Sequence, residues 1–213
     1  MLSLKWYTKW STIRYPILSG KGYVIVEQKE VLETLRKVGA ILEGHFKLTS
    51  GMHGNAYVQC ALLLKEPILA EKICRGIADH FRAKQPDLVI GPALGGVIVA
   101  YEVARQLGVP GLFTERENGK MTLRRQFTVE KGQKVLVVED VITTGGSSQE
   151  VVDLVEGMGA QVIGVGSIVD RSGGQAKLTA PYFSMLQLDV KNYDPAQCPL
   201  CAAGLPAVKP GSR

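Results

Sequence analysis

The residues best suited to chemistry lie in one stretch, 135–148, where an apolar run ends in two acids and a loop of hydroxyls and glycines follows. The acids are Glu139 and Asp140, and the loop 143–148 reads Thr-Thr-Gly-Gly-Ser-Ser. Backbone N–H groups of such a loop, with the positive end of a following helix, bind a phosphate monoester. The carboxylates would repel that phosphate, so we expect them to accept hydrogen bonds from sugar hydroxyls or to hold Mg²⁺ through its waters. The less specific interpretation is an ordinary loop after a strand with a charged end.

A strand and a helix must position this loop. The apolar run 135–138 is typical of a strand buried on both faces of a parallel sheet, and ligands bind at the C-terminal ends of such strands. Other strands and helices alternate along the chain, which predicts right-handed crossovers and a mainly parallel sheet. The further expected segments are strands at 87–90, 112–114, 162–169 and around Leu186 and Leu188, and helices over 97–107 and roughly 147–158.

The remaining segments are predicted from shorter signals. Apolar spacing predicts a helix through 27–42, and Pro67 suits the first turn of another helix. Residues 46–60 indicate a loop or short strands, and the Asn-Gly pair at 118–119 predicts a hairpin. The apolar face of the first helix consists of Val31, Leu32, Leu35 and Val38.

Composition bounds the class of protein. The 213 residues suit one α/β domain, and the chain has no apolar run near the roughly 18 residues that a membrane span needs. Residues 1–23 carry four of the five net positive charges, so residues 24–213 carry only +1 and we expect no nucleic-acid partner. Residues 1–23 also hold five of the 14 aromatic residues. We interpret them as a non-native leader, with a genuine surface arm as the alternative, and place one domain at 24–213.

The cysteines and histidines outside the loop have weaker signals. Cys60 and Cys74 lie among apolar residues as buried free thiols do, and with no export signal we expect the reducing cytoplasm. Residues 198–201 form a lone Cys-x-x-Cys in a Pro-rich tail, for which we favour a structural role over redox chemistry or an intersubunit zinc site. We expect His45 to be structural, and His53 to be either structural or part of the lining of the site.

The stretch 139–147 resembles the signature with which type I phosphoribosyltransferases bind 5-phosphoribosyl 1-diphosphate (PRPP). Four further segments are similar to the orotate phosphoribosyltransferases, and the resemblance covers about residues 27–213. It implies an α/β type I phosphoribosyltransferase fold, with a mainly parallel central sheet flanked by helices and a small hood region. The four segments are 44–51, 91–96, 115–125 and 169–171.

The resemblance also implies a reaction and roles for residues. Orotate and PRPP would give orotidine 5′-monophosphate and diphosphate in pyrimidine synthesis, with Mg²⁺ held by Glu139 and Asp140. Thr143 and Arg171 would contact orotate, since a guanidinium can meet a carboxylate with two hydrogen bonds. A mobile loop would close over the site of a neighbouring subunit in a homodimer, and Asp140 with two loop cations would be catalytic. The implied PRPP-binding residues are Arg116, Lys120, Glu139, Asp140, Val141, Ile142, Thr143, Thr144, Gly145, Gly146 and Ser147.

The chain departs from the family in its cations. The loop 116–122 lacks one lysine and the histidine that many relatives carry, and Leu94-Gly95 and Thr49 stand where relatives often have lysine. We hypothesise that Arg124 and Arg125 compensate. Two alternatives stay open: a purine phosphoribosyltransferase, against which the segment 44–51 and Arg171 speak, and a PRPP-sensing regulator without catalysis.

Overall fold

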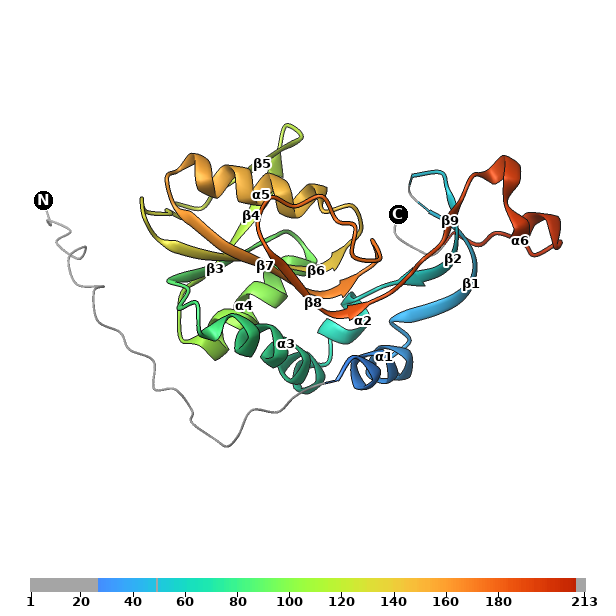
Figure 1. Cartoon of the computed structure of the whole chain (residues 1–213), viewed down its shortest axis with the longest axis horizontal. Coiled ribbons are helices and arrows are strands. Elements are labelled where there is room, and N and C mark those ends of the chain that lie inside the picture. Colours follow the sequence, from blue (N-terminus) through green and yellow to red (C-terminus); the bar gives the residue numbers. More distant parts are fainter. Residues whose placement is uncertain (1–26, 49, 210–213) are drawn as a thin grey trace, which may run out of the picture.

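A six-stranded sheet forms the centre of the computed structural model, which describes residues 27–48 and 50–209 (Figure 1). Its strand order is β5-β4-β3-β6-β7-β8, and all neighbours are parallel except β4 and β5. The predicted mainly parallel sheet is therefore confirmed. The strands are β3 (Leu88–Pro92), β4 (Gly111–Glu117), β5 (Lys120–Thr122), β6 (Lys134–Ile142), β7 (Gln161–Asp170) and β8 (Tyr182–Gln187).

Helices cover both faces of this sheet, which explains why the four residues between Lys134 and Glu139 of β6 are all apolar. Helices α3 (Pro67–Arg82) and α4 (Gly95–Leu107) lie on one face, and α5 (Gly146–Gly157) lies on the other (Figure 1). Leu136 and Val138 are buried in the core under α3 and α4, whereas Val135 and Val137 are buried in the core under α5. Alternate side chains of one strand thus fill two cores.

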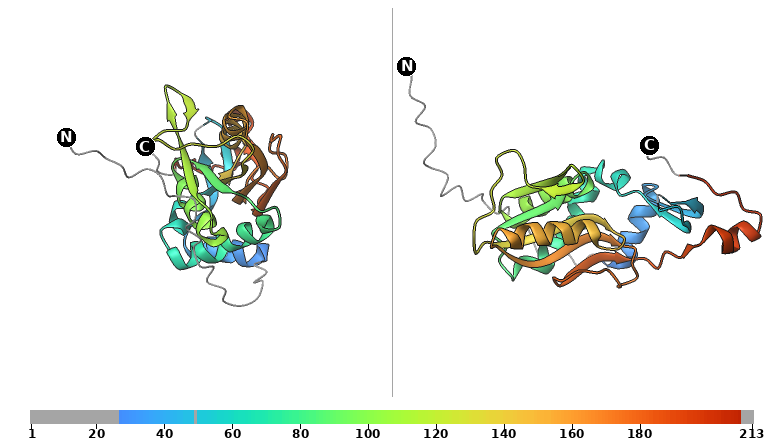
Figure 2. Two further views of the ribbon diagram at one scale, coloured as in Figure 1. Left: turned by 90° about the vertical axis from the view of Figure 1, so that its left-hand side faces the viewer. Right: turned by 90° about the horizontal axis from the view of Figure 1, so that it is seen from above.

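A second, three-stranded sheet forms the hood, in the order β1-β2-β9. The strands β1 (Ile41–Lys47) and β2 (His53–Val58) form an antiparallel hairpin, and β9 (Asn192–Tyr193) pairs with β2. Figure 2 shows the hood extending from one end of the body. The short elements around it are α1 (Gln28–Lys37), α2 (Ala61–Leu64), η1 (Pro195–Gln197) and α6 (Pro199–Ala202).

Two predicted segments differ from the structure, and the others agree within a few residues. The helix predicted through 27–42 ends at Lys37, because Gly39 takes a φ of 72° and the following residues pair with β2. Leu188 lies outside the last long strand, and the Pro-rich tail contains β9 and α6 rather than irregular chain alone. Pro67 does open α3, as predicted. The interpretation of residues 1–23 and the departure at Thr49 fall outside the described residues.

The predicted Asn-Gly hairpin is confirmed between β4 and β5. Asn118 and Gly119 take φ angles of 52° and 81°, and Glu117 pairs with Lys120. Both turn residues lie in the left-handed region that a tight two-residue hairpin requires. The hairpin stands out from the body beside α5 (Figures 1 and 2).

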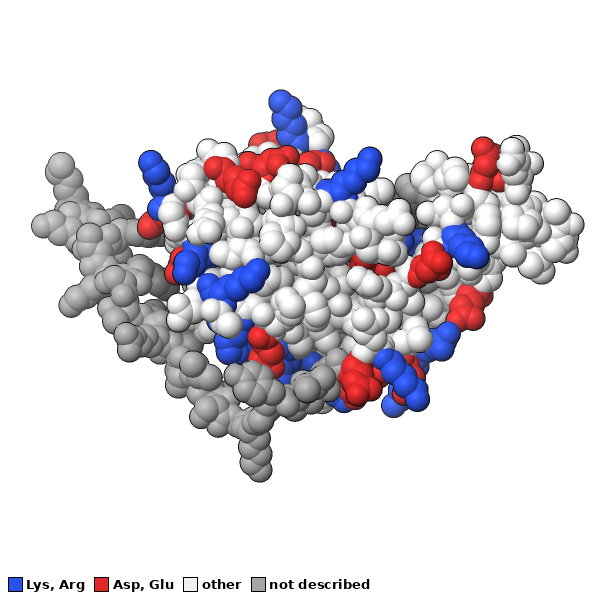
Figure 3. All heavy atoms as spheres, viewed as in Figure 1, with Lys and Arg blue, Asp and Glu red and all other residues white. Residues whose placement is uncertain are grey.

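Charges on the surface are mixed. On the face shown in Figure 3, Lys and Arg side chains are scattered and interspersed with Asp and Glu. Among the described residues, no helix is both long and apolar enough for a membrane crossing.

Candidate active site

The end of β6 and the start of α5 form a small cradle. Gly145 takes a φ of 88° immediately before α5, so the chain turns sharply and the first N–H groups of the helix face the loop. A concavity of about 50 Å³ lies there, in keeping with the predicted phosphate site. A larger concavity of about 540 Å³ lies at the opposite, N-terminal ends of β6 and β7 and is unrelated to this loop. The cradle is lined by Glu139, Val141, Thr143, Thr144, Gly145, Gly146 and Ser147.

The two carboxylates above the cradle are half-buried and lack a cationic partner among the described residues. Burial raises the pKa of Glu139 to about 7, although the hydroxyl of Ser148 donates a hydrogen bond to it and opposes the shift. Burial also raises the pKa of Asp140, against hydrogen bonds from backbone N–H groups. A cation or sugar hydroxyl groups would relieve this cost of burial.

The turn 91–96 lies directly against Asp140. A Cβ atom on Gly95 would lie 2.3 Å from the Asp140 carboxyl carbon, so only glycine leaves room for this approach. A Cβ atom on Gly91 would likewise lie 2.8 Å from the carbonyl oxygen of Val138. The peptide between Ala93 and Leu94 within the turn is cis. The structure therefore brings the 91–96 turn and the 139–147 loop together at the ends of β3 and β6.

Arg171 follows β7 and stands beside the cradle. Its N–H donates to the carbonyl oxygen of Ile142 over 2.8 Å, which anchors it next to Thr143. Its side-chain Nε is buried and has no hydrogen-bond partner among the described residues. Burial lowers the pKa of Arg171, and Tyr57 of the hood strand β2 acts in the opposite direction. A half-buried guanidinium with an unused donor is suited to a ligand carboxylate.

None of the four loop cations lines the cradle, and three of them pair with acidic residues. Arg116 makes two 2.8 Å contacts with Glu150 of α5, and Arg125 binds Glu115 at 3.0 and 2.9 Å. Arg124 lies 3.6 Å from Glu117. Lys120 is exposed and, within the described residues, makes no ion pair. The hypothesis that Arg124 and Arg125 replace the missing loop cations stays a prediction, as do the roles of Arg116 and Lys120.

Sequence reasoning missed one residue of the site, Tyr57, and the contacts of two others, Ser148 and Gly95. Ser148 is buried and binds Glu139, Gly95 makes room for Asp140, and Tyr57 approaches Arg171 from the hood. The Gly-Gly pair at 95–96 was a visible signal for close packing, but its contact with β6 depends on strand order. Tyr57 lay in a segment that was predicted only as a loop or short strands.

Replacing Glu139 tests the electrostatics of the cradle. We expect Glu139→Gln to stabilise the metal-free protein by about 3 kcal/mol at pH 8 and to leave its stability nearly unchanged near pH 4. The folded-state pKa of about 7 exceeds the ordinary value of 4.5, so the folded protein loses stability as pH rises between them. Urea unfolding with a chelator present, at both pH values, measures the difference.

The matched control for this prediction is Glu156→Gln, an exposed change at the other end of α5. It should leave the free energy of unfolding unchanged at both pH values. Equal stability of Glu139→Gln and the original chain at pH 8 would contradict the assigned cost of burial.

The sheet order, the glycine- and hydroxyl-rich cradle after β6 and the separate hood define a type I phosphoribosyltransferase. A family described as "Phosphoribosyl transferase domain" matches residues 62–200. The orotate phosphoribosyltransferase of Desulforamulus reducens is 55% identical to the chain, and the match covers 88% of the chain and 98% of that protein. The orotate phosphoribosyltransferase of Carboxydothermus hydrogenoformans is 57% identical, over 82% of the chain and 92% of that protein. The crystal structure of orotate phosphoribosyltransferase from Aeropyrum pernix matches with a TM-score of 0.63 and 28% identity, covering 74% of the chain and 93% of that protein. The chain belongs to the orotate phosphoribosyltransferase family.

Proposed function

We propose that this chain transfers the 5-phosphoribosyl group of PRPP to orotate, in a Mg²⁺-dependent reaction of pyrimidine synthesis. In this reaction the bond from the ribose C1 to the diphosphate oxygen breaks, a bond from C1 to N1 of orotate forms, and the proton of N1 passes to the diphosphate or to solvent. Orotidine 5′-monophosphate and diphosphate are the products. The observation that carries the choice of base is Arg171, a half-buried guanidinium beside the cradle whose Nε has no partner in the part of the chain that the structure describes.

The residues of the chain supply positioning and charge rather than a nucleophile, because the orotate nitrogen attacks. The cradle N–H groups and hydroxyls hold the 5-phosphate, and Glu139 and Asp140 accept hydrogen bonds from the ribose hydroxyls. Arg171 and Thr143 orient orotate through its carboxylate. Lys120 and Arg116 stabilise the leaving diphosphate when the hairpin closes and excludes water.

The carboxylates also fit Mg²⁺. Glu139 and Asp140 are adjacent, half-buried and without a cationic partner among the described residues, and burial raises the pKa of both. These two residues would hold the ion through its waters, since Mg²⁺ combines one or two carboxylates with substrate oxygens. When bound, Mg²⁺ supplies positive charge that neutralises the diphosphate.

A homodimer in which the hairpin serves the neighbouring subunit is part of this proposal. Leu94, Ile98 and Tyr101 are exposed by 86%, 46% and 69%, and their spacing places them on one side of α4, next to the 91–96 turn. An exposed apolar stripe of this kind suits a second copy of the chain. The hairpin projects beyond the body, as a loop that reaches another subunit must (Figure 2).

We place the enzyme in the cytoplasm because its four cysteines are free thiols, as in a reducing compartment. Orotate and PRPP are its proposed small-molecule partners, and neither a nucleic acid nor a membrane enters the proposed reaction.

The decisive experiment follows the absorbance of orotate with PRPP, with and without Mg²⁺, and runs uracil, adenine and hypoxanthine in parallel. We expect loss of orotate alone, and only with Mg²⁺. Turnover of a purine instead would overturn the assignment of Arg171 and leave the PRPP site standing. Binding of PRPP without turnover of any base would favour the regulator.

A further inference from the structure

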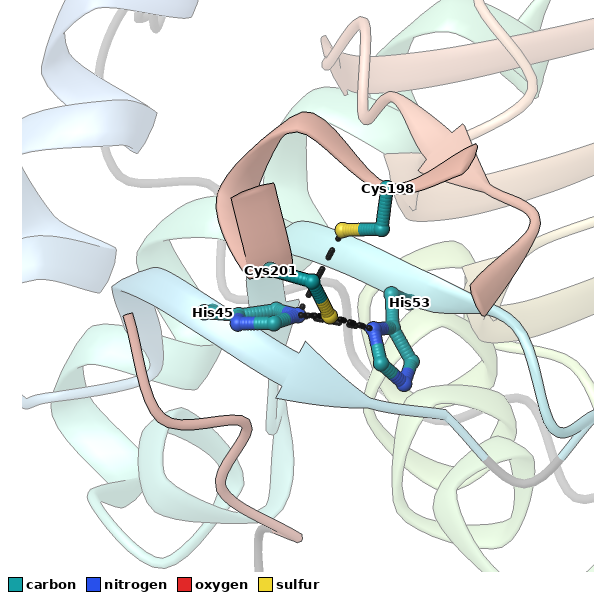
Figure 4. A group of neighbouring side chains, drawn as sticks. All are labelled: His45, His53, Cys198 and Cys201. Carbon is teal, nitrogen blue, oxygen red and sulfur yellow. Dashed lines mark hydrogen bonds between the residues drawn. The ribbon is translucent and has the colours of Figure 1, made fainter. Parts of the chain in front are cut away.

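Four side chains that the proposed reaction does not use converge at the outer end of the hood. His45 comes from β1, His53 from β2, and Cys198 and Cys201 flank the first turn of α6. One ligand atom of each lies within 4.8 Å of the others, and Figure 4 shows all four side chains pointing toward one another. The cluster lies on the side of the hood away from the body (Figures 1 and 2).

The distances within the cluster match those between the ligands of a tetrahedral zinc ion. Zn–S bonds of about 2.3 Å and Zn–N bonds of about 2.0–2.1 Å separate a sulfur and a nitrogen ligand by roughly 3.5 Å. Cys198 Sγ lies 3.5 Å from His45 Nε2, and Cys201 Sγ lies 3.8 Å from that atom and 3.3 Å from His53 Nδ1. The two ring nitrogens, 2.8 Å apart, would separate by roughly 0.5 Å on binding zinc.

The protonation of His45 also prepares it to bind a metal. Its Nδ1 lies 2.8 Å from the carbonyl oxygen of Leu205, which only accepts hydrogen bonds, so Nδ1 carries the proton. Nε2 therefore presents a lone pair to the cluster. A backbone carbonyl that fixes the tautomer of a ligating histidine in this way is a common outer contact of metal sites.

The C-terminal segment, residues 194–209, needs such an anchor because it buries almost no side chains. Cys198 is the only buried residue between 194 and 209, and α6 has only four residues. Two backbone hydrogen bonds connect Val208 with His45 and Lys47, and β9 adds two paired residues. Small segments without an apolar core commonly depend on a metal or a disulfide.

We propose that His45, His53, Cys198 and Cys201 form a structural Zn²⁺ site that ties the C-terminal segment to the β1–β2 hairpin. Two cysteines and two histidines complete the four-coordinate shell that structural zinc sites have, with no open position for substrate. On binding, the two thiols release two protons to solvent, so that two thiolates balance the charge of the ion. The site would hold one end of β2, the hood strand that also carries Tyr57.

Metal analysis of the full chain tests this inference. The chain is produced in zinc-supplemented medium and purified without chelator, and its metals are measured by mass spectrometry. We expect about one zinc per chain, and loss of most of it in Cys201→Ser and His53→Ala. Cys74→Ser is the matched control: it changes a buried cysteine of α3 outside the cluster and should keep the zinc.

Two further measurements keep the test informative if a variant fails to fold. Modification of the thiols of the unaltered chain with a mercurial should release the zinc, detected by a coloured chelator. Replacement of zinc by Co²⁺ should give the visible absorption of a tetrahedral site with thiolate-to-metal charge transfer. A chain free of zinc under these conditions, zinc retained by Cys201→Ser, or a Cys198–Cys201 disulfide in the purified chain would overturn the proposal.

Discussion

Arg171→Ala is expected to lower kcat/KM for orotate by about 10²–10³-fold, since loss of a buried charge partner costs about 2–5 kcal/mol. The affinity for PRPP should stay close to that of the original chain, because the cradle is built from β6 and α5 and not from Arg171. Burial lowers the pKa of this guanidinium and its Nε has no partner within residues 27–48 and 50–209, so the fold itself gains little from placing it there. The carboxylate of orotate would supply the hydrogen-bond acceptor that this guanidinium lacks.

Comparison with uracil isolates this interaction, because uracil has the same ring and lacks the carboxylate. Arg171→Ala should lose far less activity with uracil than with orotate, and its preference between the two bases should largely disappear. Arg75→Ala, a change at a partly exposed position of α3 whose side chain pairs with Glu71, is the control and should match the original chain with both bases. Steady-state kinetics with each base, and PRPP affinity by calorimetry, give the required values.

Equal losses with orotate and uracil would contradict the role assigned to Arg171. In that case the residue would act through the shape of the site. The hydrogen bond from its N–H to Ile142 would then explain the loss, because Ile142 ends the strand that carries both carboxylates.

Local signals predicted the body of the fold well. The alternation of apolar strands with helices predicted the parallel sheet, and Asn118-Gly119 predicted the β4–β5 turn, because each signal reflects the backbone at its own position. The first helix was predicted too long for a related reason. Val38 is the last residue of the predicted helical face, yet from Ile41 onward the chain pairs with β2, and spacing alone does not reveal that partner.

The cradle was predictable and the His/Cys cluster was not, for one physical reason. Residues 139–147 are contiguous, so one strand, one turn and one helix end assemble them. Cys201 lies 148 residues from His53, and only the docking of the C-terminal segment on the hood joins them. The Cys-x-x-Cys pair is visible in the sequence as two ligands close together. His45 and His53 become a pair only because the β1–β2 hairpin places them side by side.

Lys120→Ala and Asp140→Asn are each expected to lower kcat by about 10²–10³-fold, the cost of removing one group that stabilises developing charge. Their defects lie in different parts of the chain: Lys120 begins the second strand of the projecting hairpin, whereas Asp140 lies beside the cradle on β6. A hairpin that serves the neighbouring subunit would therefore let two inactive variants repair one another.

Co-expression of these two variants with different tags tests that arrangement. A mixed dimer would contain one site with an intact Asp140 and a Lys120 supplied by the other subunit. If half of the dimers are mixed, about a quarter of the original activity should return. If the hairpin served its own chain, every site of the mixed dimer would keep one defect and no activity would return.

The matched control pairs Lys120→Ala with Arg116→Ala, which places both defects on the hairpin. Every site then receives a damaged hairpin, and we expect no recovery. Purification by both tags in sequence proves that the mixed dimer exists.

Recovery with Asp140→Asn and none with Arg116→Ala would require each site to draw on two subunits, because in no other arrangement does an intact Lys120 meet an intact Asp140. The absence of recovery in a proven mixed dimer would instead leave Lys120 acting within its own chain. Arg116, now held by Glu150 of that same chain, would then act there too.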